Sequence, residues 1–339
     1  MSRSKNNGPD AFATYYGSMH GPRWPGLAMA CKRPSRHFAL QAGLSRTYFL
    51  DPASVLAALC LDISPGQTVL DLCAAPGGKS LVIAQRLFGL VKEPISLTGL
   101  GNLSQTGGTE NDSDEALQEV QAPAPACAAP TCASDGLLVA NELSANRRGR
   151  LRQVLSGCLP EECQSSLRTT AFDAAAWGQH EQDRYDRILL DIPCSSERHL
   201  IQDPAYLQDW SPRRSSQLAQ QAYAMGLSAG RALKTGGILL YCTCALSDLE
   251  NDDNVERIIE RSLAQSGRFG YRLDPLGPLC LDTWVSELAA MTPAGQGIEV
   301  EATRFGQRIW PDRADGFGPL YFARLRKVAA DPNPGGFPK

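Results

Sequence analysis

The chain has 339 residues, 43% of them hydrophobic and 20% charged, with a net charge of −3. These values predict one large domain, or one domain with a small appendage, and exclude a chain that is disordered throughout. No apolar stretch approaches about 18 residues, so we expect no membrane span. Eleven cysteines without a secretory signal indicate free thiols in a reducing compartment; we expect a cytoplasmic protein, with mitochondria as the alternative.

The net charge conceals two segments of opposite sign. Residues 1–50 hold seven basic residues and one acidic residue, whereas residues 91–136 hold seven acidic residues and one basic residue. The acidic segment is rich in Ser, Thr, Gly, Ala and Pro and has no sustained period, so we interpret it as a flexible insert. Without this insert the protein is basic, which favours nucleic acid as a partner.

Strands and helices are predicted to alternate along the rest of the chain. The apolar runs that predict strands cover residues 68–72, 137–140, 187–191 and 237–241. The segments that predict helices cover about 81–87, 144–155 and 215–233. Ser144 is placed to cap the second of these helices. Alternation of this kind predicts a parallel α/β sheet.

Acidic residues and cysteines fall where the predicted strands end. In parallel α/β sheets, ligands bind beyond the C-terminal ends of the strands, so one site is expected to collect these side chains. They are Asp71, Glu142, Asp173, Asp191, Cys242 and Cys244.

The turn after the first strand is rich in small residues, which let the backbone approach a ligand while the next helix offers free amides. Its spacing is not that of a phosphate-binding P-loop. Glu142, an acid at the end of the second strand, suits a ribose diol, as in dinucleotide-binding folds. A tight turn without a ligand is the alternative interpretation. The residues of the turn are Cys73, Ala74, Ala75, Pro76, Gly77, Gly78 and Lys79.

Two further strand ends carry thiols. Asp191 and Cys194 follow one predicted strand, and Cys244 follows another. An acid beside a thiol can bind the edge of a base and act covalently, although a buried inert cysteine is the commoner use of such a residue. Two separate strand-end thiols in one sheet favour the covalent interpretation.

Together these motifs resemble the Sun-type (NSUN, also called Fmu) RNA cytosine-5 methyltransferases. The resemblance covers residues 48–328 apart from the insert, and is strongest to the mitochondrial ribosomal-RNA branch and its bacterial relatives. It implies a doubly wound, mostly parallel α/β sheet of the Rossmann-like class I S-adenosylmethionine-dependent methyltransferases. The motifs that carry it lie at 48–54, 71–80, 191–199, 241–244, 250–251 and 315–322.

The resemblance also implies the roles of the site residues. Cys244 is the nucleophile that adds to carbon-6 of cytosine, Cys194 assists product release or proton removal, and Asp191 binds the cytosine edge. A swapped assignment, in which Cys194 attacks, remains open. S-adenosylmethionine brings the methyl group. The residues that match the family's cofactor contacts are Cys73, Ala74, Ala75, Pro76, Gly77, Gly78, Lys79, Glu142, Asp173 and Asp191.

Three positions depart from the family pattern. Cys242 stands where Ser is common, Ala245 where Ser or Thr is common, and Glu142 where Asp is common. Glutamate keeps two acceptor oxygens, so we expect ribose binding to be preserved. We expect alternation along the strand to point Cys242 away from Cys244.

Basic and aromatic residues indicate where RNA binds. We expect a surface that follows the phosphates and stacks bases on aromatic rings, with the target cytosine single-stranded or flipped out. The basic residues are those of the N-terminal segment together with Arg147, Arg148, Arg150, Arg152, Arg213 and Arg214. The aromatic residues are Tyr15, Tyr16, Trp24 and Phe38.

We expect three parts: a basic RNA-binding segment at 1–50, a methyltransferase domain at 51–328 with the flexible insert at 91–136, and a disordered tail at 329–339. The pairs Cys127/Cys132 and Cys158/Cys163 are spaced more widely than usual zinc ligands, so we expect no metal. His199 is expected to be structural.

The expected partner is RNA, ribosomal RNA above all, with a ribosomal subunit or a targeting protein as a further candidate. One alternative is the same reaction on transfer RNA. Another is a ribosome-assembly factor that binds RNA without turnover, which the retained Asp191, Cys194 and Cys244 argue against. A DNA methyltransferase is a weaker alternative, because the chain has no recognisable target-recognition domain.

Overall fold

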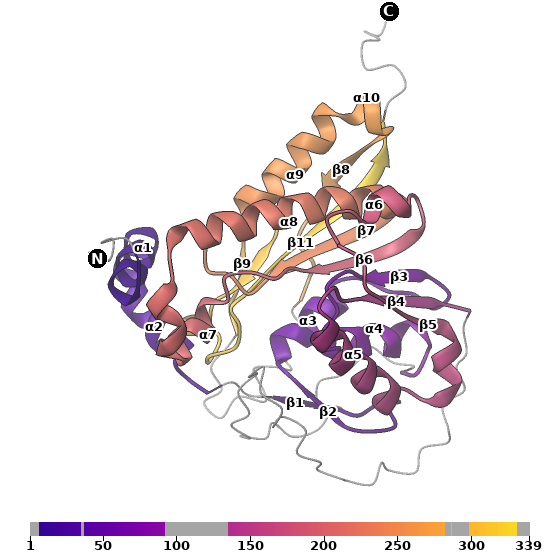
Figure 1. The fold of residues 1–339 in the computed structure, drawn as a ribbon, viewed down its shortest axis with the longest axis horizontal. Helices are drawn as coiled ribbons and strands as arrows, with labels where there is room; N and C mark the ends of the chain where they lie inside the picture. The colour runs from indigo at the N-terminus through magenta and orange to yellow at the C-terminus, as the bar shows by residue number, and fades with distance from the viewer. Residues whose placement is uncertain (1–6, 35–36, 92–134, 282–285, 287–297, 331–339) are drawn as a thin grey trace, which may run out of the picture.

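A computed structural model describes residues 7–34, 37–91, 135–281, 286 and 298–330 (Figure 1). The predicted insert and most of the predicted tail lie outside the described residues. Within the described part, nine strands form one mixed sheet in the order β5-β4-β3-β6-β7-β11-β10-β9, with β8 paired to β11. The short strands β1 (Phe38–Leu40) and β2 (Tyr48–Leu50) pair separately.

Five parallel strands form one half of the sheet. They are β3 (Thr68–Asp71), β4 (Leu137–Asn141), β5 (Leu167–Thr170), β6 (Tyr185–Asp191) and β7 (Leu233–Thr243). The chain moves outward from β3 through β4 to β5 and then returns to the other side of β3 as β6. This reversal between β3 and β6 is the point at which open α/β sheets bind their ligands. The four predicted strands are confirmed.

The other half of the sheet is antiparallel. Its strands are β8 (Tyr271–Pro275), β9 (Val300–Ala302), β10 (Gln307–Ile309) and β11 (Leu320–Ala329). β11 pairs with β7 so that Tyr321 lies opposite Thr243 and Phe322 opposite Cys242. The end of β7 that carries the predicted nucleophile is therefore flanked by hydrogen-bonded strands on both sides.

Helices cover both faces of the sheet, as a doubly wound fold requires. One face is covered by α3 (Pro52–Leu59), α4 (Gly78–Leu87) and α5 (Ala145–Cys158), and the other by α6 (Trp177–His180), α8 (Pro212–Ala232) and α9 (Asp252–Ala264) (Figure 1). Alternate strand residues face the two layers: Val69 packs with the first and Leu70 with the second. The sheet therefore separates two apolar cores.

Local sequence explains where the main helices begin. The predicted cap is confirmed, because the side chain of Ser144 accepts a hydrogen bond from the amide of Arg147. Asp51 caps α3 in the same way through the amide of Ala53, at 2.7 Å, and Pro52 occupies the first turn. None of the described helices is long and apolar enough to cross a bilayer.

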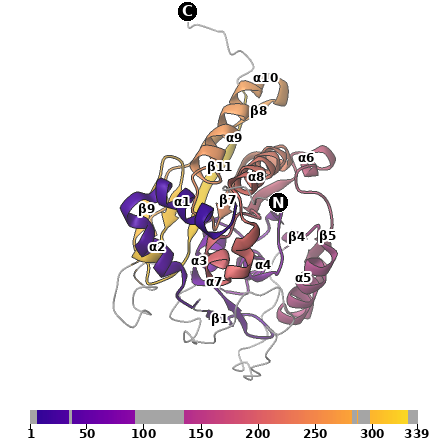
Figure 2. The same cartoon turned by 60° about the vertical axis from the view of Figure 1, so that its left-hand side comes forward.

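The N-terminal segment packs against the sheet domain through a third core. Figure 2 shows α1 (Pro9–His20) and α2 (Trp24–Cys31) beside α7 (Glu197–Gln202) and β9. This core contains Phe12 and Tyr16 of α1 together with Trp210, Leu246 and Trp310. The remaining short elements are η1 (Gly21–Arg23), η3 (Glu161–Ser166), η4 (Pro204–Asp209), α10 (Ser266–Phe269) and η5 (Pro311–Arg313).

The expectation of exposed stacking aromatics is wrong for two of the four residues. Tyr16 and Phe38 are both fully buried, Tyr16 in the third core and Phe38 in the core beneath α3 and α4. Tyr15 and Trp24 are half-buried. The sequence of a basic segment does not distinguish an aromatic residue that stacks on a base from one that fills a core.

Replacing Trp210 with alanine is expected to lower the free energy of unfolding by about 3–5 kcal/mol, because it empties the centre of the third core. Trp210 is 1% exposed, and its ring lies edge-on to Phe12 at a centroid distance of 5.1 Å. Chemical denaturation measures the change. Tyr206→Ala is the control, since Tyr206 is 52% exposed and its loss is expected to cost under about 0.5 kcal/mol. Equal losses for the two variants would contradict this packing.

Candidate active site

The strand ends of β6 and β7 bring two thiols into contact. The Sγ atoms of Cys194 and Cys244 lie 3.1 Å apart, and the hydroxyl of Ser196 lies 3.7 Å from the first and 3.4 Å from the second. Cys244 follows β7 directly, and the amide of Ile192 donates to the carbonyl of Cys242 at 3.0 Å, which keeps the two loops parallel where they leave the sheet. The predicted pair of thiols is thus one site.

Cys194 is held in its protonated form. Its contact with Cys244, and burial next, raise the pKa of the Cys194 thiol well above its ordinary value. Ser196 adopts a left-handed backbone conformation with φ of 49°, which turns the chain sharply into α7 after the thiol. A proton held on Cys194 is available as a hydrogen bond to Cys244.

Asp191 lies at the end of β6 and is paired on both oxygens. Its Oδ2 accepts from the ammonium of Lys79 at 2.7 Å, and its Oδ1 accepts from the thiol of Cys242 at 3.4 Å. Lys79 lies in the first turn of α4, directly after the small-residue turn that follows β3, so this ion pair joins that segment to the thiol strands. About a third of the Asp191 side chain remains accessible.

Cys242, which was predicted to point away from Cys244, contacts Asp191. It donates to Asp191 because the two residues lie opposite each other in the parallel β6–β7 pair, so their side chains point to the same face of the sheet. Burial raises the pKa of Cys242 well above its ordinary value. This cysteine is consequently a protonated hydrogen-bond donor to Asp191.

The turn from residue 72 to residue 79 is shaped for close approach by a ligand. Gly77 has a φ of 121°, which side chains rarely adopt, and a Cβ on Gly78 would lie 2.5 Å from Leu50. The hydroxyl of Ser80 donates to Oδ2 of Asp71 at 2.6 Å, whereas Oδ1 of Asp71 is buried without a partner. An unsatisfied buried oxygen at this turn is an acceptor that a bound ligand can use.

Glu142 follows β4 and faces the same turn. It is 5% exposed, accepts the amide of Ser144 at 2.8 Å and lies 3.5 Å from the guanidinium of Arg147. Arg147 also donates to the carbonyl of Ala75 at 3.1 Å. Glu142 is therefore fixed relative to the turn, as expected for a residue that binds a ribose diol.

Two apolar side chains beside the acids were not predicted from the sequence. Leu143 follows Glu142 and is 60% exposed, and Phe172 precedes Asp173 and is 54% exposed. Asp173 is exposed and accepts the amide of Ala175 at 2.9 Å. An exposed large apolar residue next to an acid at a strand end offers a flat ring a surface to pack on; this adjacency is the signal that could have identified both residues.

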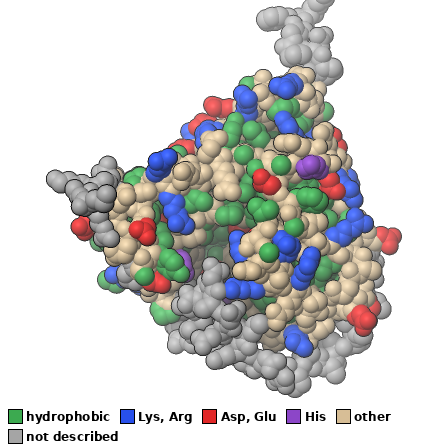
Figure 3. Space-filling model, in the orientation of Figure 1, with side chains coloured by type: hydrophobic (Ala, Val, Ile, Leu, Met, Phe, Trp, Pro, Cys, Tyr) green, Lys and Arg blue, Asp and Glu red, His purple; other side chains and the backbone are tan. Residues whose placement is uncertain are grey.

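The basic residues divide between structural and exposed positions. Arg148 donates to the carbonyls of Glu142 and Leu143 at 3.0 Å each, and Arg23 and Arg33 pair with Asp312 and Asp315. Figure 3 shows Lys and Arg side chains spread over the part of this face that contains α5 in Figure 1. His199 is half-buried, and its ring lies 5.0 Å from that of Tyr206.

Asp71 is expected to make stability depend on pH. Burial raises its pKa to about 7, above an unfolded value of about 4, so its stabilising contribution is full below about pH 4 and is lost as pH rises to about 7. Asp71→Asn cannot ionise, and we expect its melting temperature to fall less over this range than that of the wild type. Parallel melting-temperature profiles for the two proteins would contradict the assignment.

Comparisons with known proteins show which methyltransferases the chain is similar to. Residues 125–268 match the family model described as 16S rRNA methyltransferase RsmB/F. The mouse protein named 5-cytosine rRNA methyltransferase NSUN4 is 31% identical over 293 residues, which cover 84% of this chain and 61% of the mouse protein. A zebrafish protein named tRNA (cytosine(34)-C(5))-methyltransferase, mitochondrial, is 27% identical over 84% of this chain and 62% of its own length. The chain thus spans about three fifths of these relatives.

A solved structure shows the same fold. A methyltransferase homologue from Pyrococcus horikoshii has a TM-score of 0.57 and 19% identity, and the match covers 94% of this chain and 95% of that one. The central sheet with helices on both faces is the Rossmann-like class I fold. The family-model match over residues 125–268 and the 31% identity to the mouse protein, with the motifs gathered at one sheet edge, show that the chain is similar to the Sun-type (NSUN, RsmB/F) methyltransferases.

Proposed function

We propose that this protein transfers a methyl group from S-adenosylmethionine to carbon-5 of a cytosine in RNA, and that the RNA is ribosomal. The observation that carries the proposal is the contact of two thiols, 3.1 Å apart, beside a carboxylate at the ends of β6 and β7. Carbon-5 of cytosine is too weak a nucleophile to accept a methyl group directly. A thiol that adds to the ring removes that barrier, and a second thiol serves the steps that release it.

We assign the two thiols different roles in the reaction. The Cys244 thiolate forms a bond to carbon-6 of the cytosine, and the electron pair of the ring double bond moves to carbon-5, which accepts the methyl group. Loss of the carbon-5 proton to a base then re-forms the double bond and expels the thiolate. The contact of Cys194 with Cys244, which raises the pKa of Cys194 well above its ordinary value, supports this order.

Asp191 is placed to hold the cytosine. Its side chain lies at the same sheet edge as the thiols, is partly accessible and is oriented by Lys79 and Cys242. A carboxylate accepts hydrogen bonds from the amino edge of cytosine and stabilises a proton added at ring nitrogen 3. The ion pair with Lys79, at 2.7 Å, holds the Asp191 side chain in place for this task.

The residues around the first turn fit S-adenosylmethionine, which supplies a methyl group on a positively charged sulfur when bound. Glu142 would accept the two ribose hydroxyls, and Leu143 and Phe172 would pack against the adenine. The turn at Gly77 would leave room for the amino-acid end of S-adenosylmethionine, and the unpartnered Oδ1 of Asp71 would accept a hydrogen bond from it. The acids at the strand ends, Asp71, Glu142, Asp173 and Asp191, suit a ligand with a positive charge.

The ribosomal substrate is favoured by the relatives. The family model and the mouse protein are both named for ribosomal RNA. A ribosomal subunit or a targeting protein would complete recognition, and residues 1–50 and the arginines of α5 would contact the phosphates. Transfer RNA is the alternative substrate, because the zebrafish relative is named for it. That relative is also named as mitochondrial, so mitochondria are a location to test beside the cytoplasm.

The test supplies purified protein with a labelled methyl donor and, separately, small-subunit ribosomal RNA and transfer RNA that lack modifications. We expect 5-methylcytosine in ribosomal RNA, measured by mass spectrometry of nucleosides. Product in transfer RNA alone would keep the chemistry and replace the substrate. RNA binding without 5-methylcytosine in either pool would favour the assembly-factor alternative.

A further inference from the structure

Two glutamates lie buried directly behind the thiol pair. Glu197 begins α7, three residues after Cys194, and Glu250 precedes α9, six residues after Cys244; they are 0% and 1% exposed. Neither touches a cation in the described structure, and both contact the hydroxyl of Ser195. Buried carboxyl groups without a cationic partner are costly, so their positions need an explanation.

Glu250 holds the loop that carries Cys194, and Glu197 holds the loop that carries Cys244. Oε2 of Glu250 accepts the amide of Ser195, next to Cys194, at 3.0 Å. Oε2 of Glu197 accepts the amide of Leu246, two residues after Cys244, also at 3.0 Å. The two carboxyl groups therefore tie the β6 loop to the β7 loop in both directions.

The hydrogen-bond count shows that the pair shares a proton. The Oγ of Ser195 contacts Oε1 of Glu197, at 2.8 Å, and also Oε1 of Glu250. A hydroxyl has one proton to donate, so one carboxyl must carry a proton and donate in return. Burial raises the pKa of Glu197, and burial followed by the charge of Glu197 raises that of Glu250 to about 7, in line with this count.

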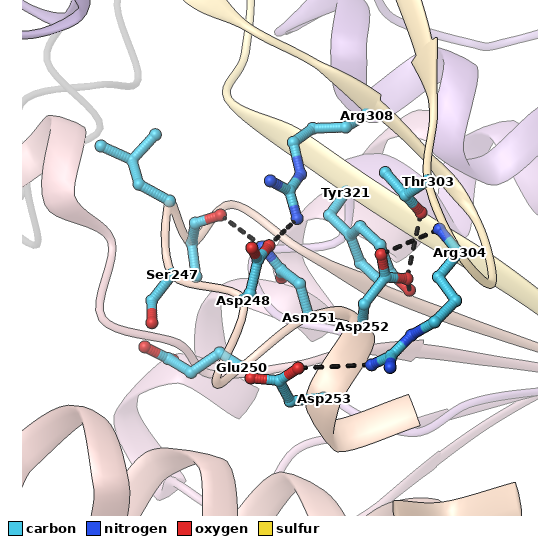
Figure 4. Close-up of polar contacts among 12 residues, drawn as sticks. Ser247, Asp248, Glu250, Asn251, Asp252, Asp253, Thr303, Arg304, Arg308 and Tyr321 are labelled. Atoms are coloured by element: carbon cyan, nitrogen blue, oxygen red, sulfur yellow. Dashed lines mark hydrogen bonds and ion pairs between the residues drawn. The ribbon is translucent and has the colours of Figure 1, made fainter. Parts of the chain in front are cut away.

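Contacts with α1 and with the segment before α9 hold the two glutamates in place. Tyr16 of α1 donates to Oε1 of Glu197, which connects the N-terminal segment to the thiol loops. Figure 4 shows the segment that carries Glu250: Asp248 faces Arg308, and Asp252 faces Thr303 and Tyr321. Asn251 accepts from the hydroxyl of Thr243 at 2.6 Å and donates to the carbonyl of Ala245, the two residues that flank Cys244.

We propose that Glu197 and Glu250, joined through Ser195, are positioning residues that hold Cys194 and Cys244 in contact for the methyl-transfer reaction. The role rests on the proposed function, but the geometry it predicts does not depend on turnover. Without Glu250, the amide of Ser195 loses its acceptor and the loop of Cys194 is free to move away from β7. A displacement of about 1 Å in a catalytic group costs about 100-fold in rate.

The experiment measures how fast the two thiols can be joined. Diamide takes two electrons and two protons from a pair of thiols and leaves a disulfide, and peptide mapping quantifies the link between Cys194 and Cys244. We expect Glu250→Ala to slow this link about 100-fold. Glu250→Gln keeps an acceptor for the amide of Ser195 and a donor for its hydroxyl, as the protonated acid does, so we expect it to stay within about twofold of wild type.

The control is Glu181→Ala, which removes a partly buried contact, from Tyr185 to a glutamate, at the opposite end of β6. We expect no change in its rate. A folded Glu250→Ala protein that links its thiols at the wild-type rate would overturn the proposal, as would a Glu250→Gln protein as slow as the alanine variant.

Thermal unfolding shows whether each variant is folded. If Glu250→Ala does not fold, Ser195→Ala replaces it, and we expect this variant to slow the link about tenfold. An unchanged linking rate in Ser195→Ala would overturn the proposal.

Methyl transfer gives a second, separate measurement. We expect Glu250→Ala to lower kcat and leave KM for the methyl donor unchanged, because Glu250 contacts the thiol loop and not the turn after β3. A wild-type protein without methyltransferase activity would contradict the proposed function, but the rate at which its two thiols are linked could still be measured. Rapid linking in the alanine variant would contradict the positioning role and leave the proposed function intact.

Discussion

Replacing Cys244 with alanine is expected to remove the covalent adduct with RNA and to lower methyl transfer by roughly 10⁴-fold or more, as loss of a nucleophile does in other covalent enzymes. The physical reason is that neither neighbouring thiol is placed to act instead: contact with Cys244, and burial next, raise the pKa of Cys194 well above its ordinary value, and Cys242 donates to Asp191. The adduct is measured by denaturing electrophoresis after incubation with RNA that contains 5-fluorocytosine, whose carbon-5 fluorine prevents the release step.

Cys194→Ala separates the two assignments. We expect this variant to form the adduct and to release product slowly, so the covalent complex accumulates on unmodified RNA as well. Cys280→Ala is the control, because Cys280 is an exposed cysteine after β8; we expect wild-type activity. A covalent complex that survives Cys244→Ala and disappears in Cys194→Ala would reverse the roles of the two thiols.

Asp191→Asn is expected to lower kcat by about 100-fold or more, in the range found when one preorganised polar group is removed from an active site. Asparagine fills the same volume but carries no charge, so the ammonium of Lys79 loses its carboxylate at 2.7 Å and the amino edge of cytosine loses a charged acceptor. Steady-state kinetics with the substrate RNA measures the effect, which we expect in kcat more than in KM.

Asp186→Asn is the matched control for Asp191. Asp186 lies on the same strand and also pairs with a lysine, Lys234, at 2.9 Å, but it belongs to the end of β6 away from the thiols. We expect its kcat to stay within about twofold of wild type. Equal losses in the two variants would mean that β6 requires its ion pairs for folding and that Asp191 has no separate role.

Much of the site could be predicted because strand ends follow from local pattern. A short apolar run followed by an acid or a thiol places that side chain at the edge of a parallel sheet, and this is why Asp191, Cys194 and Cys244 were expected together. The order of strands around β3 then fixes which ends are neighbours. The family resemblance added the roles of the residues, which no local pattern contains.

What the sequence did not reveal depends on contacts between distant segments. Tyr16 and Phe38 belong to a basic segment, yet they fill cores built by residues 150 or more positions away as well as by near neighbours. The antiparallel strands β8, β9 and β10 are short; β8 and β10 pair with β11, and β9 pairs with β10. Glu197 and Glu250 meet across Ser195 only when β6 and β7 lie side by side.

Bisulfite sequencing of total RNA from cells with and without the gene shows whether this protein methylates cytosine carbon-5 in RNA. We expect one ribosomal cytosine to lose its methylation when the gene is removed, and we expect wild-type protein to restore it whereas Cys244→Ala does not. Unchanged methylation at every cytosine in the RNA would overturn the proposed function.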